Sequence, residues 1–392
     1  MMTTTANRAW AEMPPWARFE SLGQAAQAAV EYAENSTEVQ LLPSELQPVA
    51  LDGQLLVDVR HAGGRKAVTY NAAGQLAELA GVPSGYLRSL PADLAAVNLA
   101  YGLKTREEAG RSVVALSYRK PGEDFSTIRS MTSEVYKRLW SAKLFLALAE
   151  VQAAAPGCWV AVPAFDNGLS RGPEDKRLAL AEDVGPWTFV TEGQEIMKGK
   201  SIYYNPGVAR DTFVLLVNTA REVGEGLFRY VMLWNGESGG VSIGAETGLV
   251  DAFCGNNLGW GAKDIRSWRF NHVGNGLSFR TMRELSGMLS KVHEHGTEEE
   301  LLGINAAKRY ILDAGADLSQ IPTVASRVTG LPQGTIKKAM DKAETAGRYG
   351  DPRSAWSVLG GLTEYSQTLS SVAERVDVDR AAGRLVDFSL KQ

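Results

Sequence analysis

The sequence predicts an α+β protein, in which a mainly antiparallel sheet is backed by a long helix and followed by an all-helical C-terminal domain. Two observations predict this class. Short apolar and β-branched runs separated by turn residues recur before Gly296, and few helices interrupt them. After Gly296 the apolar residues recur at helical spacing instead. Strands followed by a run of helices are typical of α+β proteins.

The same change of pattern predicts three parts. Residues 1–45, where Trp10 and Trp16 stand among small and polar residues, are expected to form a flexible N-terminal arm. Residues 46–295 would form the α+β core, and residues 297–392 the helical domain. The aromatic residues of the arm would either cover the arm's own core or clip onto a neighbouring subunit.

Local residue preferences place the elements of the core. Thr132 or Ser133 can cap a long helix over about Ser133–Ala154, whose apolar residues Val135, Leu139, Ala142, Leu146 and Ala149 give it a core face. Asn71 should cap a shorter helix, which Gly81 ends. The other expected elements are strands at Leu55–Val59, Ala67–Tyr70, Ser112–Tyr118, Cys158–Val162, Trp187–Val190, Phe213–Val217, Phe228–Trp234 and Val241–Ile243, and helices at Gln24–Ala33, Ala72–Leu79 and Pro91–Tyr101.

Charge and cysteine content narrow the class of protein. The 392-residue chain has a formal net charge of −4, so a local groove must supply any positive potential for nucleic acid. Cys158 and Cys254 are too few for a disulfide framework and favour a reducing compartment. Residues Met1–Thr5 lack the features of a signal peptide, and no apolar run reaches about 18 residues. We expect a soluble cytoplasmic protein without a membrane segment.

The most informative stretch runs from Phe228 to Arg283. A strand-like run precedes the turn cluster Asn235–Gly240, and basic residues interleaved with rings follow. Guanidinium groups beside flat apolar faces can hold a phosphate backbone and stack bases. A strand pair with buried tryptophan and solvated arginine would give the same pattern. The candidate nucleic-acid-binding residues here are Lys263, Arg266, Trp268, Arg269, Phe270, His272, Arg280 and Arg283.

Strand alternation places Arg266, Trp268 and Phe270 on one face and Arg269 on the other. If the region binds nucleic acid, the arginines should face one groove with Trp268 or Phe270 at its floor. A second basic and aromatic patch lies on a Gly-rich segment, where a finger on nucleic acid and a solvated hairpin are both open. Its residues are Lys198, Lys200, Tyr203 and Tyr204.

One pattern in the C-terminal region is typical of a DNA-binding motif. Ser326, Gly330 and Ile336 have the spacing of the small, turn and apolar positions of a helix-turn-helix. Thr335–Lys342 would be its recognition helix, with three lysines for phosphate, and a generic helical hairpin is the alternative. The helices expected in this half are Leu277–His295, Glu299–Ala314, Leu318–Val328, Thr335–Ala346, Ala355–Leu369 and Ala373–Leu385.

No catalytic or metal-binding motif stands out in the sequence. His293 and His295 are two residues apart, which puts them on different faces of a helix rather than around one metal. Glu237 and Asp251 are isolated acids, unlike the clustered carboxylates of a two-metal nuclease. No phosphate-binding loop of the GxxxxGK[ST] type occurs. The sequence therefore favours a protein that is not an enzyme and uses neither metal nor cofactor.

Five short segments resemble, in the same order, the motifs of a large family of phage- and plasmid-like proteins known as a domain of unknown function. The match covers roughly residues 65–295, and the third segment departs from the family at Gly236 and Ser238. In the second segment Thr-Ser-Glu stands where Ser-Asp is usual. The segments are Leu76–Leu87 (LA-x-x-x-GxPxxYL), Ser130–Leu139 (LSDxYxxID), Trp234–Gly239 (NSEVG), Phe253–Leu258 (CxNxL) and His272–Gly274 (RHxG).

The resemblance implies traffic with DNA, because members occur mainly in phages, plasmids and mobile islands, often near antirestriction or recombination genes. With the basic and aromatic stretch, it leads us to expect a protein that binds or anneals single-stranded DNA, or another nucleic acid, in recombination or replication. If phage-encoded, it would act in the host cytoplasm. We expect a homo-oligomer, since many weak contacts in series suit a long polymer. The alternatives are an antirestriction or regulatory protein acting through protein contacts, and a nucleic-acid-processing enzyme with dispersed acids.

Overall fold

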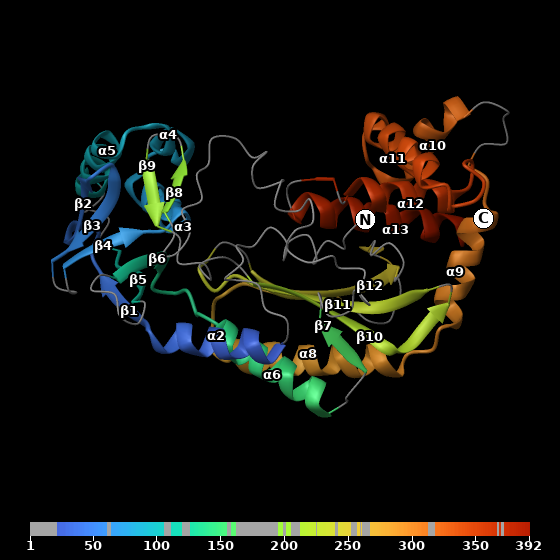
Figure 1. Ribbon diagram of the computed structural model, residues 1–392, viewed down its shortest axis with the longest axis horizontal. Helices are drawn as coiled ribbons and strands as arrows, with labels where there is room; N and C mark the ends of the chain where they lie inside the picture. The colour runs from blue at the N-terminus through green and yellow to red at the C-terminus, as the bar shows by residue number, and fades with distance from the viewer. Residues whose placement is uncertain are drawn as a thin grey trace.

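Two sheets and a group of C-terminal helices form the molecule, so the predicted α+β class is confirmed. Figure 1 shows two lobes, one on each sheet, with α2 (Leu22–Glu34) and α6 (Ser141–Ala154) along the side that joins them. The computed structural model describes residues 22–60, 64–105, 111–119, 126–154, 158–161, 195–198, 201–204, 212–224, 226–239, 242–251, 257–258, 260, 267–312, 318–366, 368–369 and 372–392.

The first sheet has eight strands in the order β1-β5-β6-β4-β3-β9-β8, and β2 pairs with β3 outside this path. Its pairs are antiparallel except β3 with β9 and β4 with β6. Asp52 (φ 50°) and Gly53 (φ 78°) form the two-residue turn between β2 and β3, where positive φ angles match the strand twist. The strands are β1 (Ser36–Leu41), β2 (Leu46–Leu51), β3 (Gln54–Val59), β4 (Gly64–Val68), β5 (Val113–Tyr118), β6 (Ser126–Ser133), β8 (Glu195–Lys198) and β9 (Ser201–Tyr204).

Three helices share a core with this sheet: α3 (Tyr70–Ala80), α4 (Ser84–Ser89) and α5 (Ala92–Thr105). Gly81 ends α3 as predicted, with φ 71°. The predicted cap at Asn71 is wrong, because the Oγ1 of Thr69 accepts the capping hydrogen bond from the Ala72 amide at 3.1 Å. The same hydroxyl donates to the Arg129 carbonyl at 3.0 Å, which holds Thr69 at the helix start.

The predicted helix Ser133–Ala154 is wrong at its N-terminal end. α6 begins at Ser141, and Ser126–Ser133 form β6 between β5 and β4. Pairing on both sides satisfies the backbone of this segment, and it outweighs the local capping signal. As a result Val135 is exposed rather than part of a core face, and Leu146 on α6, also predicted for that face, is 46% exposed. The shorter α6 does back a sheet, through Leu144 and Leu148.

Residues 22–45, expected within a flexible arm, form regular structure. α2 packs against α6 with Ala26 and Ala29 buried, and β1 pairs with β5 at the edge of the first sheet. Tyr32 of α2 stacks on Tyr118 of β5 with 4.0 Å between ring centroids. These partners lie far along the chain, which is why the local composition did not reveal them. Residues 1–21 lie outside the described part of the chain.

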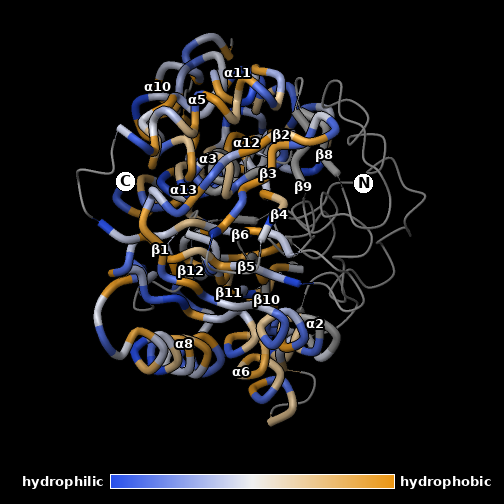
Figure 2. The backbone as a smooth tube through the Cα atoms, turned by 90° about the vertical axis from the view of Figure 1, so that its left-hand side faces the viewer, coloured by the Kyte–Doolittle hydropathy of each residue, from blue (hydrophilic) through white to orange (hydrophobic). Residues whose placement is uncertain are grey.

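The second sheet has six antiparallel strands in the order β13-β12-β11-β10-β7, with β14 also paired to β12. α6 and α8 (Leu277–Glu294) lie side by side beneath it (Figures 1 and 2). The predicted apolar face of α8 is confirmed, since Leu285, Met288 and Val292 are buried against the sheet. The strands are β7 (Trp159–Ala161), β10 (Thr212–Gly224), β11 (Leu227–Asn235), β12 (Ile243–Asp251), β13 (Asn257–Leu258) and β14 (Trp268–Phe270).

The C-terminal helices begin just after Gly296, and the described residues from 298 onward contain no strand. They pack on the opposite face of the second sheet from α8, where Leu249 and Trp260 share a core with Ile304 and Val386. The helical region therefore completes the core of this sheet. Its helices are α9 (Glu298–Arg309), a short 3-10 turn (Leu318–Gln320), α10 (Ile321–Thr329), α11 (Gln333–Ala346), α12 (Ala355–Ser366) and α13 (Val372–Ser389).

Candidate nucleic-acid interface

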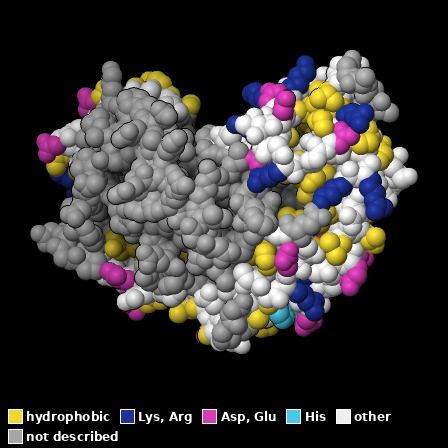
Figure 3. Space-filling view, turned by 45° about the vertical axis from the view of Figure 1, so that its right-hand side comes forward, with side chains coloured by type: hydrophobic (Ala, Val, Ile, Leu, Met, Phe, Trp, Pro, Cys, Tyr) yellow, Lys and Arg dark blue, Asp and Glu magenta, His cyan; other side chains and the backbone are white. Residues whose placement is uncertain are grey.

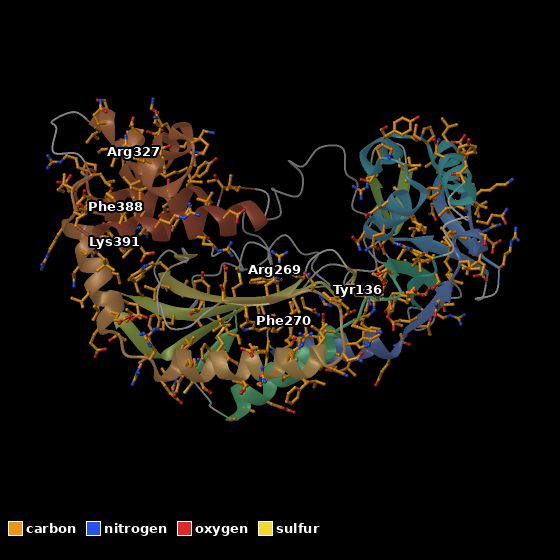
Figure 4. All side chains as sticks on the ribbon, turned by 180° about the vertical axis from the view of Figure 1, so that it is seen from behind. Tyr136, Arg269, Phe270, Arg327, Phe388 and Lys391 are labelled. Carbon is orange, nitrogen blue, oxygen red and sulfur yellow. The ribbon has the colours of Figure 1, made fainter. Side chains whose placement is uncertain are left out.

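The predicted basic and aromatic stretch folds into the short strand β14 and the start of α8. Trp268 and Phe270 are half-buried against α8, and their rings stack with 5.3 Å between centroids. Arg269 is exposed on the other face, as strand alternation predicted, and its Nε donates to the Ser242 hydroxyl at 2.5 Å. Figure 4 shows Arg269 and Phe270 on opposite sides of the strand. Lys263 and Arg266 lie outside the described residues.

This arrangement differs from the predicted groove with a ring at its floor. The guanidinium carbon of Arg280 lies 5.2 Å from the centre of the Phe270 ring, on the α8 side of the strand, whereas Arg269 lies on the other side. The rings of Trp268 and Phe270 pack into the core against the apolar face of α8. Trp268 and Phe270 therefore pack, and they do not present a free face to a base.

The start of α8 presents a different exposed ring, which lies in the predicted stretch but is not among the predicted contacts. The ring of Phe279 is 71% exposed. Arg283, one turn further along the same face, has a 65% exposed side chain and an ion pair with Glu284 at 3.1 Å. Phe279 interrupts the polar face of an amphipathic helix, and that departure from the pattern is the signal that could have identified it.

The backbone at this helix start is also available to an anion. Gly276 occupies the N-cap position with φ 77°, and no side chain caps the helix. The first amides of a helix have no partner within the helix, and the helix dipole favours negative charge there. Arg280 is half-buried, and its Nη2 lies 3.4 Å from the Val273 carbonyl, to which it donates. Arg283, Phe279 and this uncapped turn thus form one local surface, which we call the α8 entry surface.

His272, another predicted contact, is structural in its placement. The ring is only 3% exposed and stacks on Tyr136 with 4.8 Å between centroids. Its Nδ1 lies 3.2 Å from the Lys137 carbonyl, and since a carbonyl only accepts, Nδ1 carries the proton. Nε2 has no hydrogen-bond partner among the described residues. Burial lowers the pKa of His272 below its usual range, so the ring stays neutral and does not bind phosphate.

A buried polar network surrounds Glu237, in the turn after β11. Arg129 of β6 pairs with its Oε1 at 3.0 Å, and the Ser141 amide at the start of α6 donates to Oε2 at 2.6 Å. Arg138 donates to the carbonyl of Glu237, and the Tyr136 hydroxyl donates to that of Gly236. This network joins the two sheets.

Four of the five segments that resemble the phage- and plasmid-like family lie at or beside this network. Gln75, just before the first segment, donates from Nε2 to the Ser238 carbonyl at 2.9 Å, and its Oε1 accepts from the Met131 amide at 2.8 Å. Tyr136 forms a bridge with Val273, which follows His272. Most of the segment Phe253–Leu258 lies outside the described residues. The segments on which the resemblance rests therefore lie at or near the contact between the two sheets.

The segment predicted as a helix-turn-helix or a generic helical hairpin folds into α10 and α11, joined by a short turn. Gly330 (φ 76°) begins the turn Gly330-Leu331-Pro332, and the Ser326 hydroxyl donates to the Leu331 carbonyl at 2.6 Å. Ala325, Ile336 and Ala339 are fully buried, so the two helices pack as such a motif requires. The exposed face of α11 consists of Gln333, Gly334, Lys337, Lys338, Asp341, Glu344 and Thr345.

Charge on the C-terminal helices is mixed. Figure 3 shows Lys and Arg side chains dispersed among acidic ones on the visible face of this lobe. On α11, Lys337 and Lys338 are exposed and Lys342 is half-buried, with Asp341 and Glu344 between and beyond them. Any contact of this helix with phosphate would therefore involve individual lysines rather than a continuous basic face.

The second predicted patch lies on the hairpin of β8 and β9, which confirms the hairpin but not its role. Lys198 pairs with Ser201, and Tyr203 and Tyr204 follow on β9. The structure describes only the backbone of Lys198, Tyr203 and Tyr204, and Lys200 lies outside the described residues. The predicted strand Trp187–Val190 also lies outside them.

Two further features, a metal-binding cluster and a membrane-spanning helix, have no counterpart among the described residues. No group of three His, Cys, Asp or Glu side chains in that part of the chain could hold a metal ion. No helix found there is long and apolar enough to span a bilayer.

Comparison of the chain with protein-family models, with curated proteins and with solved structures gives no match. The resemblance to phage- and plasmid-like proteins therefore stays a prediction that rests on the motif segments.

Proposed function

We propose that this chain binds single-stranded DNA, and that the α8 entry surface is its contact with the strand. The observation that carries the proposal is the exposed ring of Phe279 beside the exposed guanidinium of Arg283, at a helix start without a side-chain cap. On this proposal the protein acts in the cytoplasm as a homo-oligomer, without catalysis, metal or cofactor. It would serve recombination or replication of a phage or plasmid.

The chemistry of the surface suits a strand with unpaired bases. An exposed aromatic face stacks on any base, and such stacking is worth about 1–3 kcal/mol per base. A guanidinium and the amides of a helix start both bind phosphate oxygens. Lys137 adds an exposed cation next to the loop before α8, since its amide donates to the His272 carbonyl at 2.6 Å. Phe279, Arg283 and the first amides of α8 thus lie at one helix start, and Lys137 is in the segment that is hydrogen-bonded to the loop before it.

Two arginines of the sheets, Arg129 on β6 and Arg229 on β11, are occupied by internal partners. Arg129 and Arg229 are each 1% exposed and are paired with Glu237 and Glu300. The chain is acidic overall, so its composition does not indicate nucleic-acid binding. The exposed cations beside an exposed ring are the stronger argument for it.

A second candidate contact, for duplex DNA, is favoured by the packing of α10 and α11. The three-residue turn and the buried Ile336 and Ala339 match a helix-turn-helix, and they leave Gln333, Lys337 and Lys338 exposed on the helix that would enter the major groove.

Binding of fluorescent single-stranded and duplex oligonucleotides at several salt concentrations tests both surfaces. Phe279→Ala should weaken single-strand binding by about 1–3 kcal/mol with little change in its salt dependence, because stacking releases few counterions. Arg283→Ala should weaken it and lower the salt slope by about 0.7, the value for one phosphate of a single strand. Lys337→Ala with Lys338→Ala should affect only duplex binding.

Leu302→Ala is the matched control, because Leu302 is a 64% exposed apolar residue on α9, away from both surfaces. If Phe279→Ala and Arg283→Ala bind single strands like the parent, the α8 entry surface is not the contact. If the parent binds no nucleic acid, the alternative of a regulatory or antirestriction protein acting through protein contacts takes its place. Metal-dependent cleavage of the oligonucleotides would indicate a nuclease instead.

A further inference from the structure

The outward face of α5 carries a row of large apolar side chains with no described partner. Leu94 is 48% exposed, Val97 64% and Tyr101 73%. They are three and four residues apart, so they lie in one stripe along the helix. The inner face of α5 is buried in the core of the first sheet. Tyr86 of the neighbouring α4 is 54% exposed and adds a second exposed ring to this part of the lobe.

Opposite charges stand at the two ends of this stripe. Asp93 lies in the first turn of α5 and Lys104 in the last, and both are exposed. Neither forms an ion pair within the part of the chain that the structure describes. An apolar stripe between an acid and a base is complementary to a copy of itself that runs in the opposite direction.

We propose that α5 is a contact between two copies of this chain, packed antiparallel across a two-fold axis. The midpoint between Leu94 and Tyr101 falls between residues 97 and 98, and the midpoint between Asp93 and Lys104 between residues 98 and 99. One axis near Val97 therefore brings Leu94 against the partner's Tyr101 and Asp93 near the partner's Lys104.

The same charges exclude the parallel arrangement, because it would place the two Asp93 carboxylates together and the two Lys104 ammonium groups together. Tyrosine is also enriched at protein interfaces, since it covers a large area and loses little side-chain freedom. The α5 face thus deepens the proposed homo-oligomer by assigning it a surface. The α5 face lies on the first lobe, apart from α11 (Figure 1), so dimer formation through α5 and duplex binding through α11 can be tested separately.

Sedimentation at micromolar protein tests the contact. The parent should be a dimer, and Val97→Glu and Tyr101→Glu should each weaken the dimer by at least about tenfold, because a buried unpaired charge opposes association. Leu302→Glu is the control, since it places the same charge on an equally exposed apolar site of α9. A monomeric parent, or a dimer that is unchanged by both α5 variants, would overturn the proposal.

Charge reversal tests the antiparallel direction. Asp93→Lys and Lys104→Asp should each weaken the dimer, and the double variant should restore it, because each new charge again faces its opposite. Val97→Cys should form a disulfide between copies under mild oxidation, while Leu302→Cys should not, and the parent controls for Cys158 and Cys254. The cysteine variants stay informative even where Val97→Glu fails to fold. Single reversals without an effect, or no cross-link at Val97, would contradict the arrangement. Loss of the dimer with single-strand binding intact would separate this contact from the α8 entry surface.

Discussion

His272 is buried as a neutral imidazole whose protonation the surrounding structure opposes. Its Nδ1–H is satisfied by the Lys137 carbonyl at 3.2 Å. A proton on Nε2 would add a buried donor that has no acceptor among the described residues. Burial, followed by the repulsion from Arg138, accounts for the lowered pKa, which the hydrogen bond to Lys137 only partly offsets.

The lowered pKa of His272 predicts a pH dependence of stability. Between its lowered folded-state pKa and about 6.5 the unfolded chain binds more protons at this ring than the folded chain, so the contribution of His272 to the free energy of unfolding rises with pH in this window and is constant above it. His272→Phe keeps the ring stack and removes the titration. The difference in unfolding free energy between parent and variant, measured in urea, should therefore grow as the pH rises to about 6.5.

Comparing the two proteins removes the contribution of Glu246, which has the opposite sign. Burial raises the pKa of Glu246, so its contribution to stability falls as the pH rises through that pKa in both proteins. A constant difference between parent and His272→Phe over this range would show that His272 does not titrate as its surroundings require.

Arg229 and Glu300 form a second buried unit, which ties β11 to α9. Their side chains are 2% and 1% exposed, and Nε–Oε1 and Nη2–Oε2 contacts of 2.8 Å and 3.0 Å make the pair bidentate. Glu300→Gln leaves a buried guanidinium without its counter-charge, and should lower the free energy of unfolding by about 3–5 kcal/mol in urea denaturation. Arg229→Met combined with Glu300→Leu should recover most of the loss, since neither desolvated charge remains.

Asp377→Asn is the control for that series. Asp377 pairs with Arg380 at 3.5 Å, and its side chain is 76% exposed, so its loss should cost no more than about 1 kcal/mol. Equal effects of Glu300→Gln and Asp377→Asn would mean that burial of the Arg229 pair does not set its contribution.

At the scale of elements, the crossing of α11 and α12 depends on the absence of a side chain at Gly361. A Cβ at this position would overlap the Ala339 carbonyl group and lie 3.1 Å from the Ala343 Cβ. Gly361→Ala should therefore push the helices apart and lower the free energy of unfolding by about 1–3 kcal/mol. It should also weaken any duplex binding through α11. Thermal or urea unfolding measures the first effect, and oligonucleotide titration the second.

Gly334 on α11, the helix that Gly361 of α12 packs against, provides the control. A Cβ there meets no atom within 4 Å, and its φ is not in the left-handed region. Gly334→Ala should be neutral or stabilising by up to about 1 kcal/mol, because alanine loses less backbone freedom in a helix. A destabilisation like that of Gly361→Ala would argue against close approach as the cause.

Elements with a strong internal period could be predicted from the sequence. α8 was expected over Leu277–His295 and spans Leu277–Glu294, because its apolar residues alone define the face that it buries. β6 could not be predicted in this way. The flanking strands β4 and β5 were expected at Ala67–Tyr70 and Ser112–Tyr118, but the local sequence does not show that Ser126–Ser133 pairs between them. The start of α6 was misplaced for the same reason.

At the scale of the whole molecule, the division into two sheets could not be predicted from the sequence. Strand pairing joins residues far apart, such as Ser36 with Tyr118 and Lys66 with Ser126, and no local pattern encodes these pairs. The candidate site shows the same limit. Composition identified the stretch that contains Arg283, but only the packing of α8 decides that Phe270 is covered and Phe279 is exposed.

Glu237 links the two sheets, and it predicts how the whole molecule unfolds. Its carboxylate pairs with Arg129 of the first sheet and accepts the amide that begins α6, which packs on the second. Glu237→Gln removes the negative charge that pairs with the buried Arg129, which is 1% exposed. The free energy of unfolding should fall by about 3–5 kcal/mol. Hydrogen exchange should then show β5 and β6 opening separately from β11 and β12, which in the parent should open together.

Glu38→Gln is the control within the same network. Glu38 pairs with Arg138 at 2.7 Å, and the Arg138 side chain is 3% exposed, but that of Glu38 is 44% exposed, so water reaches the site and the cost should be smaller than that of Glu237→Gln. In this variant the protection of the two sheets should remain coupled. If Glu237→Gln unfolds at the same urea concentration as Glu38→Gln, with equal protection across both sheets, the sheets are joined by the apolar packing of α2 and α6 rather than by the buried carboxylate.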